Sequence, residues 1–253
     1  MNPNGLRARI LSGETLSGTF VKTPAHEVIE LLALSGLDFI CIDCEHAAND
    51  RRGMDASLAM ATALGLPALV RVPEFTPANV LMALDSGALG VVIPHVTSGE
   101  KARAVAKAAH FGHGGRGFAG STRWAGNGSQ NMGQVLAQDV ETIVLAQIEE
   151  PEGVDALDDI AATDGIDGLF VGPADMAVSL GVNDITHADV RDVMRQVGAA
   201  AKRHGKAAVT FQPTTATVPD LKDLGISMFF IGSEHTFMLK AAKQVAADIA
   251  TQK

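Results

Sequence analysis

Two acidic residues, Glu149 and Asp175, each follow a short apolar run of the sequence and are candidates for metal ligands. Gln147 lies two residues before Glu149, so on a strand the two side chains point to the same face. Two carboxylates with no His or Cys at ligand spacing suit a hard cation that keeps several waters, which indicates magnesium or manganese. The alternative is that both carboxylates pair with Arg71 or are solvated at the edge of a cavity. The residue types alone leave both interpretations open.

Arg71 and His46 are candidates for the groups that handle charge and protons. Arg71 lies in the apolar run 69–72, and its guanidinium presents a fork of donors matched to a carboxylate or enolate oxygen. The alternative is a structural ion pair with Asp43 or Glu45. His46 follows the apolar run 38–43 and can serve as a general base near neutral pH. His46 is a candidate only because these charged residues accompany it, since a lone histidine in a loop more often has no catalytic role.

The two cysteines, Cys41 and Cys44, form a C-x-x-C pattern that is also found in redox and zinc sites. Position 41 lies inside an apolar run, and residues three apart on a strand face opposite ways. A zinc site needs a second pair of ligands, and the sequence holds no further cysteine. We therefore expect both cysteines to be ordinary small buried residues.

The candidates lie at the ends of eight short apolar runs that alternate with Ala- and Leu-rich stretches of helical period. The predicted strands are 18–21, 38–43, 68–72, 90–94, 142–149, 168–172, 206–211 and 228–232. The predicted helices are 24–35, 53–64, 76–86, 99–109, 153–162, 187–204, 214–224 and 234–250. Eight such units predict an α/β fold, a single-domain (β/α)8 TIM barrel. An open doubly wound sheet is the competing fold, but the first run leads into Lys22-Thr23-Pro24 instead of a glycine-rich turn.

A barrel places its active site at the carboxyl ends of the strands. Most of the predicted strands end in polar side chains, and charged groups that converge on one rim imply a polar site with a ligand or metal. The long irregular segment 112–132 holds seven glycines together with Arg116, Arg123 and Trp124. A loop of this length in a compact barrel is expected to be a lid or an interface element.

The composition argues against several classes of partner. The chain has 253 residues, 47% hydrophobic and 19% charged, which is enough for one large core. Its net charge of −9 provides no basic field for nucleic acid or an anionic membrane surface. No apolar run approaches the roughly 20 residues that span a bilayer. The first nine residues lack the apolar segment of a secretory signal, so we expect a cytoplasmic protein.

An ordered set of motifs, at these separations, resembles the HpcH/HpaI aldolases, which are class II pyruvate aldolases on a (β/α)8 barrel. The resemblance extends from about Gly18 to the C-terminal helix. The motifs are LDFICIDCEH at 37–46, VRV at 70–72, LDSGA at 84–88, GRG at 115–117, QIE at 147–149 and GIDGLFVGPAD at 165–175.

The resemblance implies roles for the residues around a metal. Glu149 and Asp175 would be the protein ligands of a divalent cation, which is magnesium, manganese or cobalt in this family. Gln147 and the backbone around Ala174 and Asp175 would hold the pyruvate moiety. Arg71 would stabilise the enolate oxygen, so a Schiff-base lysine is not required.

The resemblance also implies a base and the reaction that it serves. His46 would handle the hydroxyl proton of the acceptor during carbon–carbon cleavage. Asp85 would raise the basicity of His46, and Asp43 would help to hold the barrel mouth. The implied reaction is the reversible cleavage of a 4-hydroxy-2-oxo acid to pyruvate, or a close 2-oxo acid, and an aldehyde.

Two departures from the family pattern concern the acceptor aldehyde, which the sequence does not identify. Gln212 follows the seventh predicted strand, where relatives have small or aliphatic residues, and it is a candidate to hydrogen-bond a polar acceptor. His95 stands where relatives often carry methionine. Members of the family commonly form hexamers built from trimers, so the resemblance implies a homo-oligomer in which helix 234–250 packs on a neighbouring subunit.

Two other functions remain open on the sequence. A CoA-ester lyase or a 2-oxo-acid decarboxylase would use the same metal-enolate site. A CoA ester needs a basic patch for its phosphates, and the expected rim offers only Arg116 and Arg123. A non-catalytic barrel that binds small carboxylates is the second alternative.

Overall fold

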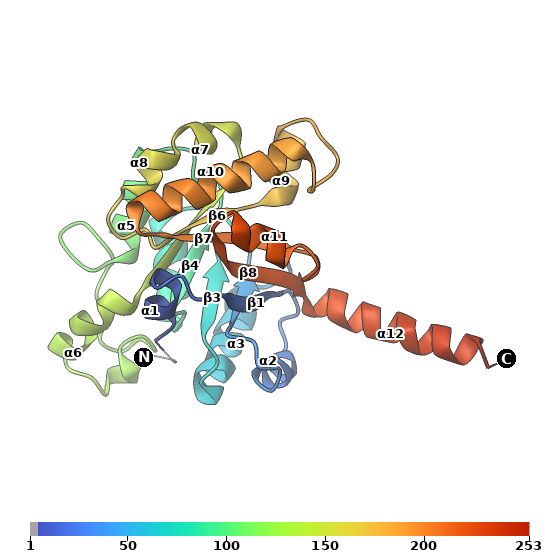
Figure 1. Ribbon diagram of the computed structural model, residues 1–253. Helices are drawn as coiled ribbons and strands as arrows, with labels where there is room; N and C mark the ends of the chain where they lie inside the picture. The colour runs from blue at the N-terminus through green and yellow to red at the C-terminus, as the bar shows by residue number, and fades with distance from the viewer. Residues whose placement is uncertain (1–4, 253) are drawn as a thin grey trace.

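Eight parallel strands close into a barrel in chain order in the computed structural model, which describes residues 5–252 (Figure 1). The strands are β1 Leu16–Val21, β2 Phe39–Asp43, β3 Ala68–Arg71, β4 Gly90–Ile93, β5 Ile143–Ile148, β6 Gly168–Val171, β7 Ala207–Gln212 and β8 Ile226–Ser233. Every predicted strand is present, and each end lies within two residues of its predicted position. The (β/α)8 prediction is confirmed.

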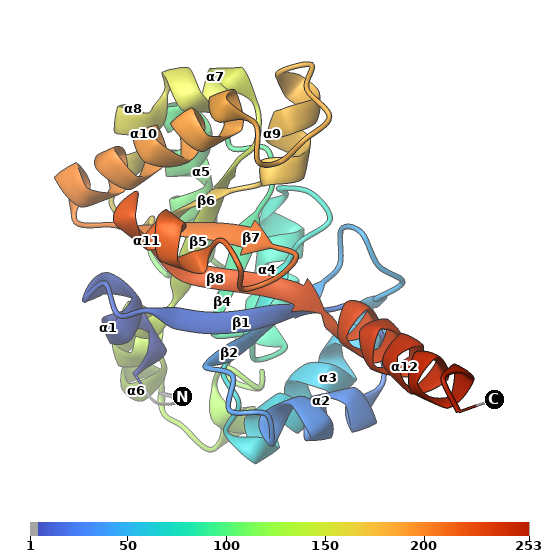
Figure 2. The same cartoon turned by 45° about the vertical axis from the view of Figure 1, so that its right-hand side comes forward.

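The helices lie around the outside of the barrel (Figures 1 and 2). They are α1 Leu6–Leu11, α2 His26–Ala33, α3 Arg51–Leu64, α4 Pro77–Asp85, α5 Gly99–Ala109, α6 Met132–Ala137, α7 Pro151–Asp155, α8 Leu157–Ala161, α9 Pro173–Ser179, α10 Ala188–His204, α11 Val218–Asp223 and α12 Glu234–Ala250. Two 3-10 turns, Gly126–Gly128 and Gln138–Glu141, flank α6. The prediction of one helix over 153–162 is wrong in detail, because the chain leaves helical geometry at Ala156 and forms α7 and α8.

The barrel interior is filled by side chains, several of them aromatic. Phe170 and Phe230 stack with ring centroids 4.7 Å apart, and Phe39 meets Phe230 edge-on at 4.8 Å. Gly18 is required beside this cluster, because a Cβ at that position would collide with the ring of Phe39. The interior is therefore a packed core, and ligands have access only at its ends.

The amino-terminal helix α1, which the apolar pattern did not predict, covers this core at the amino ends of the strands. Its Leu6 and Ile10 side chains are fully buried and belong to the same cluster as the barrel phenylalanines. Arg7 extends from α1 to the buried carboxylate of Asp167, with Nη2 2.7 Å from Oδ1. The opposite end, at the carboxyl ends of the strands, is left for the site.

Local capping explains where two helices begin. Thr76, which precedes Pro77, caps α4, since its hydroxyl accepts a hydrogen bond from the backbone N–H of Asn79 at 3.1 Å. Thr23 precedes Pro24 in the same pattern but caps no helix, because α2 begins later, after Ala25, without a side-chain cap. The Thr23 hydroxyl instead lies 2.8 Å from Nε2 of His235, at the start of α12.

The glycine-rich segment after α5 is packed down on the barrel wall. Trp124 is 1% exposed, and the Arg116 guanidinium lies between the rings of Phe111 and Trp124, 4.7 Å from each centroid. Arg123 donates to the backbone carbonyl of Ser86 at the end of α4. These contacts fix the segment against α4 and the end of α5.

The last helix, α12, projects away from the barrel (Figures 1 and 2). All residues from 235 to 250 are exposed. The apolar side chains among them are Phe237, Met238, Leu239, Val245 and Ile249, at 40–67% exposure. Among the described residues, no helix is both long and apolar enough to cross a membrane.

Candidate active site

A cavity of about 300 Å3 opens at the carboxyl ends of the strands. Five residues predicted from the sequence line it, namely His46, Arg71, Gln147, Ala174 and Asp175. They come from the loop after β2 and from β3, β5 and α9, so the barrel brings together residues more than 100 positions apart. Three phenyl rings, those of Phe20, Phe170 and Phe211, form an apolar part of the wall. The cavity thus combines a small apolar space with charged groups, as small-molecule sites do.

Arg71 is held by a buried pair of hydrogen bonds with Asp43. Arg71 Nε and Nη2 donate to the two carboxylate oxygens at 3.0 and 2.8 Å, and the Asp43 side chain has no exposed surface. Burial acts to raise the pKa of Asp43, but the hydrogen bonds and charge of Arg71 outweigh it and lower the pKa. The guanidinium also lies 4.4 Å from the ring centroid of Phe20. Arg71 is therefore a fixed, permanently charged donor in the cavity wall.

Glu45, which the sequence suggested only as a possible partner of Arg71, lies at the centre of the charged network. Its Oε2 is 3.3 Å from Arg71 Nε and 3.7 Å from His46 Nε2, and its Oε1 is 3.8 Å from His95 Nε2. Burial, together with the charge of Glu149, raises the pKa of Glu45 against the opposing effect of Arg71 and the two histidines. Glu45 therefore links the candidate base to the candidate metal ligand.

Glu149 is almost fully buried and is held from two sides. Its Oε1 accepts from the backbone N–H of His95 at 2.8 Å and lies 3.1 Å from the ring Nδ1 of the same residue. Its Oε2 accepts from the side-chain amide of Gln147. His95 has a φ of 56°, in the left-handed region that is uncommon for a non-glycine residue. This backbone conformation brings the backbone nitrogen and the ring Nδ1 of His95 to the same oxygen, Glu149 Oε1.

The donor set fits a hard divalent cation. Glu149 at the end of β5 and Asp175 in the first turn of α9 follow neighbouring strands, and Asp175 faces the cavity. Gly172 keeps the space beside them open, because a Cβ there would lie 3.0 Å from Glu149 Oε2. The buried Oε1 of Gln147 has no hydrogen-bond partner. Among residues 5–252 no group of three or more His, Cys, Asp or Glu side chains is placed to hold a metal ion, so the remaining ligands of such a cation would be water or substrate.

A model of the HpcH/HpaI aldolase/citrate lyase family matches residues 16–241 of the chain. The chain belongs to this family. It is 32% identical to a hydroxypyruvate/pyruvate aldolase of Paraburkholderia phytofirmans, over 97% of both chains. It is 33% identical to a 5-keto-4-deoxy-D-glucarate aldolase of Salmonella paratyphi C, over 97% of this chain and 96% of that one. A crystal structure of a family member from Burkholderia cenocepacia superposes with a TM-score of 0.92 at 34% identity, covering 98% and 99% of the two chains. The protein is an aldolase or related lyase, as the sequence predicted.

Three of the predicted site residues do not line the cavity, namely Glu149, which lies beside it, Asp85 and Gln212. Asp85 accepts a hydrogen bond from Arg116 Nη2 at 2.6 Å, and no hydrogen bond or ion pair joins it to His46 in the described residues. Gln212 accepts from the hydroxyl of Thr217 at 3.0 Å and is 4% exposed. Side chains alternate along β7, so it is Phe211 that faces the cavity.

His46 lies on the loop after β2. Its backbone N–H donates to Asp43 Oδ1 at 3.1 Å, while its ring is 55% exposed and lines the cavity. Lys22, one residue beyond β1, lines the cavity as well. The strand pattern did not indicate this, because the direction of a side chain just past a strand is not fixed by alternation.

The two cysteines are free thiols. Cys41 is fully buried in the barrel interior, and burial raises its pKa. Burial, together with the charge of Asp43, raises the pKa of Cys44 to about 12. Both are neutral at physiological pH. The expectation that they are buried is confirmed for Cys41, whereas Cys44 is only partly buried.

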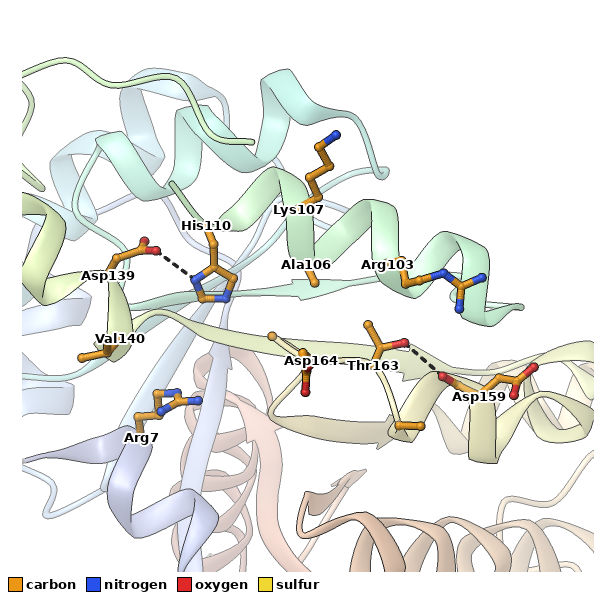
Figure 3. A pocket seen from close by; sticks show the side chains of 12 residues that line it. Arg7, Arg103, Ala106, Lys107, His110, Asp139, Val140, Asp159, Thr163 and Asp164 are labelled. Atoms are coloured by element: carbon orange, nitrogen blue, oxygen red, sulfur yellow. Dashed lines mark hydrogen bonds and ion pairs between the residues drawn. The ribbon is translucent and has the colours of Figure 1, made fainter. Parts of the chain in front are cut away.

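A larger cavity of about 840 Å3 lies near the amino ends of β5 and β6 (Figure 3). Its histidine, His110, has Nδ1 3.2 Å from Oδ2 of Asp139, and its Arg7 pairs with Asp167. Lys107 points away from the other labelled side chains in Figure 3. Enzymes with this barrel fold have their active sites at the carboxyl ends of the strands, so the smaller cavity is the candidate active site.

Proposed function

We propose that the protein is a class II aldolase that reversibly cleaves a 4-hydroxy-2-oxo acid to pyruvate, or a close 2-oxo acid, and an aldehyde. The observation that carries this proposal is the cavity itself. It sets the fixed guanidinium of Arg71 against Gln147 and Asp175 around one small space, with the Glu149 carboxylate beside them. Such a space suits a 2-oxo acid whose carbon–carbon bond breaks to leave an enolate.

Glu149 and Asp175 would hold the divalent cation, which is magnesium, manganese or cobalt. When bound, this cation supplies a Lewis acid that stabilises the negative charge of an enolate. The chain's part is to fix the ligands: His95 and Gln147 hold the Glu149 carboxylate at both oxygens. Gln147 and the backbone at Ala174 and Asp175 would position the 2-oxo acid.

Arg71 would donate hydrogen bonds to the oxygen on which charge develops. Asp43 holds the guanidinium in place before substrate arrives, so no reorganisation is needed when the charge appears. His46 would take the proton from the C4 hydroxyl during cleavage and return it during addition. Its ring is exposed toward the cavity and lies 3.7 Å from the Glu45 carboxylate, which would stabilise the protonated imidazole.

The two arginines that a CoA-ester reaction would require are engaged elsewhere. The Arg116 side chain is fully buried against Asp85 and two aromatic rings. Arg123 pairs with Asp55 at 2.8 Å and donates to a backbone carbonyl. Neither lines the cavity, which favours a small aldehyde over a CoA ester.

We also propose that the chain forms a homo-oligomer, a trimer or a hexamer, through α12. The apolar side chains of α12 are exposed over the full length of the helix, and exposed apolar surface of this extent is typical of an interface. Sedimentation velocity of the whole chain and of a chain ending at Ser233 tests this. Loss of assembly on truncation supports it, and an unchanged oligomer contradicts it.

The proposed reaction is tested by proton NMR of pyruvate in deuterated buffer. The enzyme is stripped of metal and then resupplied with magnesium, manganese or cobalt. We expect metal-dependent loss of the methyl signal, a loss of rate of about 100-fold or more in Arg71→Ala, and no change in Arg203→Ala, a surface control. Methyl exchange that persists after chelation, or that survives in Arg71→Ala, would contradict the proposal.

A further inference from the structure

The order of the strands places the residues that line the cavity on two opposite sides. In a closed barrel of eight strands in chain order, β1 lies across from β5. Gln147 and Glu149 belong to the β5 side, and Asp175 follows β6. Lys22 follows β1, and Thr236 follows β8, so these two lie on the far wall. If the 2-oxo acid occupies the β5–β6 side, the acceptor occupies the β8–β1 side.

The ammonium group of Lys22 has donors to spare on that wall. Its Nζ lies 3.5 Å from Asp43 Oδ2 and 3.5 Å from the carbonyl oxygen of His46, both beyond the usual range for a strong hydrogen bond. Asp43 Oδ2 already accepts from Arg71 Nη2 at 2.8 Å, and Oδ1 accepts from Arg71 Nε and from two backbone N–H groups. Lys22 is 30% exposed and lines the cavity, so a ligand can reach its charge.

The position of Lys22 is nevertheless fixed at the backbone. The nearly buried carboxylate of Glu234 accepts from the N–H of Lys22 at 2.9 Å and from the N–H of Thr23 at 2.7 Å. Asn49 donates to the carbonyl of Lys22 at 3.5 Å. The backbone of Lys22 is thus held, its ammonium group is reachable, and its side-chain contacts to Asp43 and His46 are both long, at 3.5 Å, so the side chain is suited to bind an anion.

Resting on the proposed aldolase function, we infer that Lys22 binds a carboxylate carried by the acceptor, so that the chain acts on aldehyde acids. In the addition direction, the methyl carbon of pyruvate loses a proton and forms a bond to the aldehyde carbon, whose oxygen gains a proton. The product is a 4-hydroxy-2-oxo dicarboxylate, and no electrons are gained or lost. A cavity of about 300 Å3 is at the lower end for small-molecule sites, so the acceptor is short.

The test uses two acceptors of equal length, 2-hydroxy-3-oxopropanoate and glyceraldehyde. They differ only in a carboxylate that replaces a hydroxymethyl group. Addition of pyruvate to each is measured as kcat and KM in the wild type, in Lys22→Met and in Lys22→Arg. Lys222→Met, a change on the exposed face of α11, is the matched control. Methyl exchange of pyruvate alone is measured in every variant.

In Lys22→Met, kcat/KM for the acid is expected to fall about 10- to 100-fold, mainly through KM, because a charge-assisted hydrogen bond is lost. We expect glyceraldehyde addition and pyruvate exchange to change less than about threefold, and Lys22→Arg to restore the preference for the acid. Equal loss with both acceptors, or no loss with either, overturns the inference and leaves the aldolase proposal intact. Absence of pyruvate exchange in the wild type overturns both.

Discussion

The buried ion pair of Arg71 and Asp43 is expected to contribute more to the free energy of unfolding than an ion pair on the surface does. Asp43→Asn keeps the shape of the side chain but removes the charge that balances Arg71. Removing one partner of a buried pair costs about 3–5 kcal/mol. Glu45 Oε2 remains 3.3 Å from Arg71 Nε and offsets part of the loss, so we expect about 3 kcal/mol. For a chain of this size that corresponds to a fall in Tm of about 6–12 °C.

The matched control is Asp55→Asn. Asp55 accepts from Arg123 at 2.8 Å, the same distance as in the buried pair, but its side chain is 51% exposed. An exposed pair contributes about 0–1 kcal/mol. Thermal and urea unfolding of the three proteins, followed by circular dichroism at one protein concentration, measures both effects. The reasoning is refuted if Asp43→Asn and Asp55→Asn unfold within about 1 kcal/mol of each other.

The same pair gives a pH dependence whose sign is fixed. The pKa of Asp43 is lower in the folded chain than in the unfolded chain, because Arg71 outweighs the effect of burial. The stabilisation is therefore complete above the ordinary aspartate pKa of about 3.9 and is lost as pH falls through the lower value. The difference in stability between wild type and Asp43→Asn should be constant from pH 5 to 7 and shrink in more acidic buffer.

Two further predictions concern histidines. The variant His95→Asn tolerates the left-handed backbone and keeps the hydrogen bond from the backbone N–H to Glu149, so it removes only the ring. We expect its affinity for manganese, measured by isothermal titration calorimetry, to be about tenfold weaker. An unchanged Kd would show that the ring does not support the carboxylate. Burial lowers the pKa of His110, but the hydrogen bond and charge of Asp139 more than offset it and raise the pKa. The stabilisation by His110 should thus be complete below pH 6.5 and be lost as pH rises above that value, so the Tm difference between wild type and His110→Asn should be larger at pH 6 than at pH 9.

The strands of this fold were predictable because each is an apolar run bounded by Gly, Pro or Asp. The missed helices had weaker signals. Helix α1 has six residues and no side-chain cap, and α9 has seven residues, begins at Pro173 and also lacks a side-chain cap. The break between α7 and α8 at Ala156 comes from one residue outside helical geometry, and no residue type marks it.

At the site, the residues inside strands were easier to predict than those just after them. Gln147 and Arg71 lie in strands, where alternation determines the face. Lys22 and His95 lie beyond strand ends, and His95 reaches Glu149 only through a left-handed backbone that its residue type does not require. Whether Gln212 or its neighbour Phe211 faces the cavity depends on the alternation of side chains along β7, and the apolar pattern did not specify which residues point inward.

Helix α12 joins two properties that are usually separate. Its first turn supplies Thr236 to the cavity and Glu234 to the backbone of Lys22. Its remaining turns, about 20 Å long at 1.5 Å per residue, project from the barrel as an exposed apolar surface. Whatever covers that surface therefore holds the same rigid element that shapes the acceptor wall. Specific activity should consequently depend on protein concentration, falling on dilution, even though every proposed catalytic group lies within a single barrel.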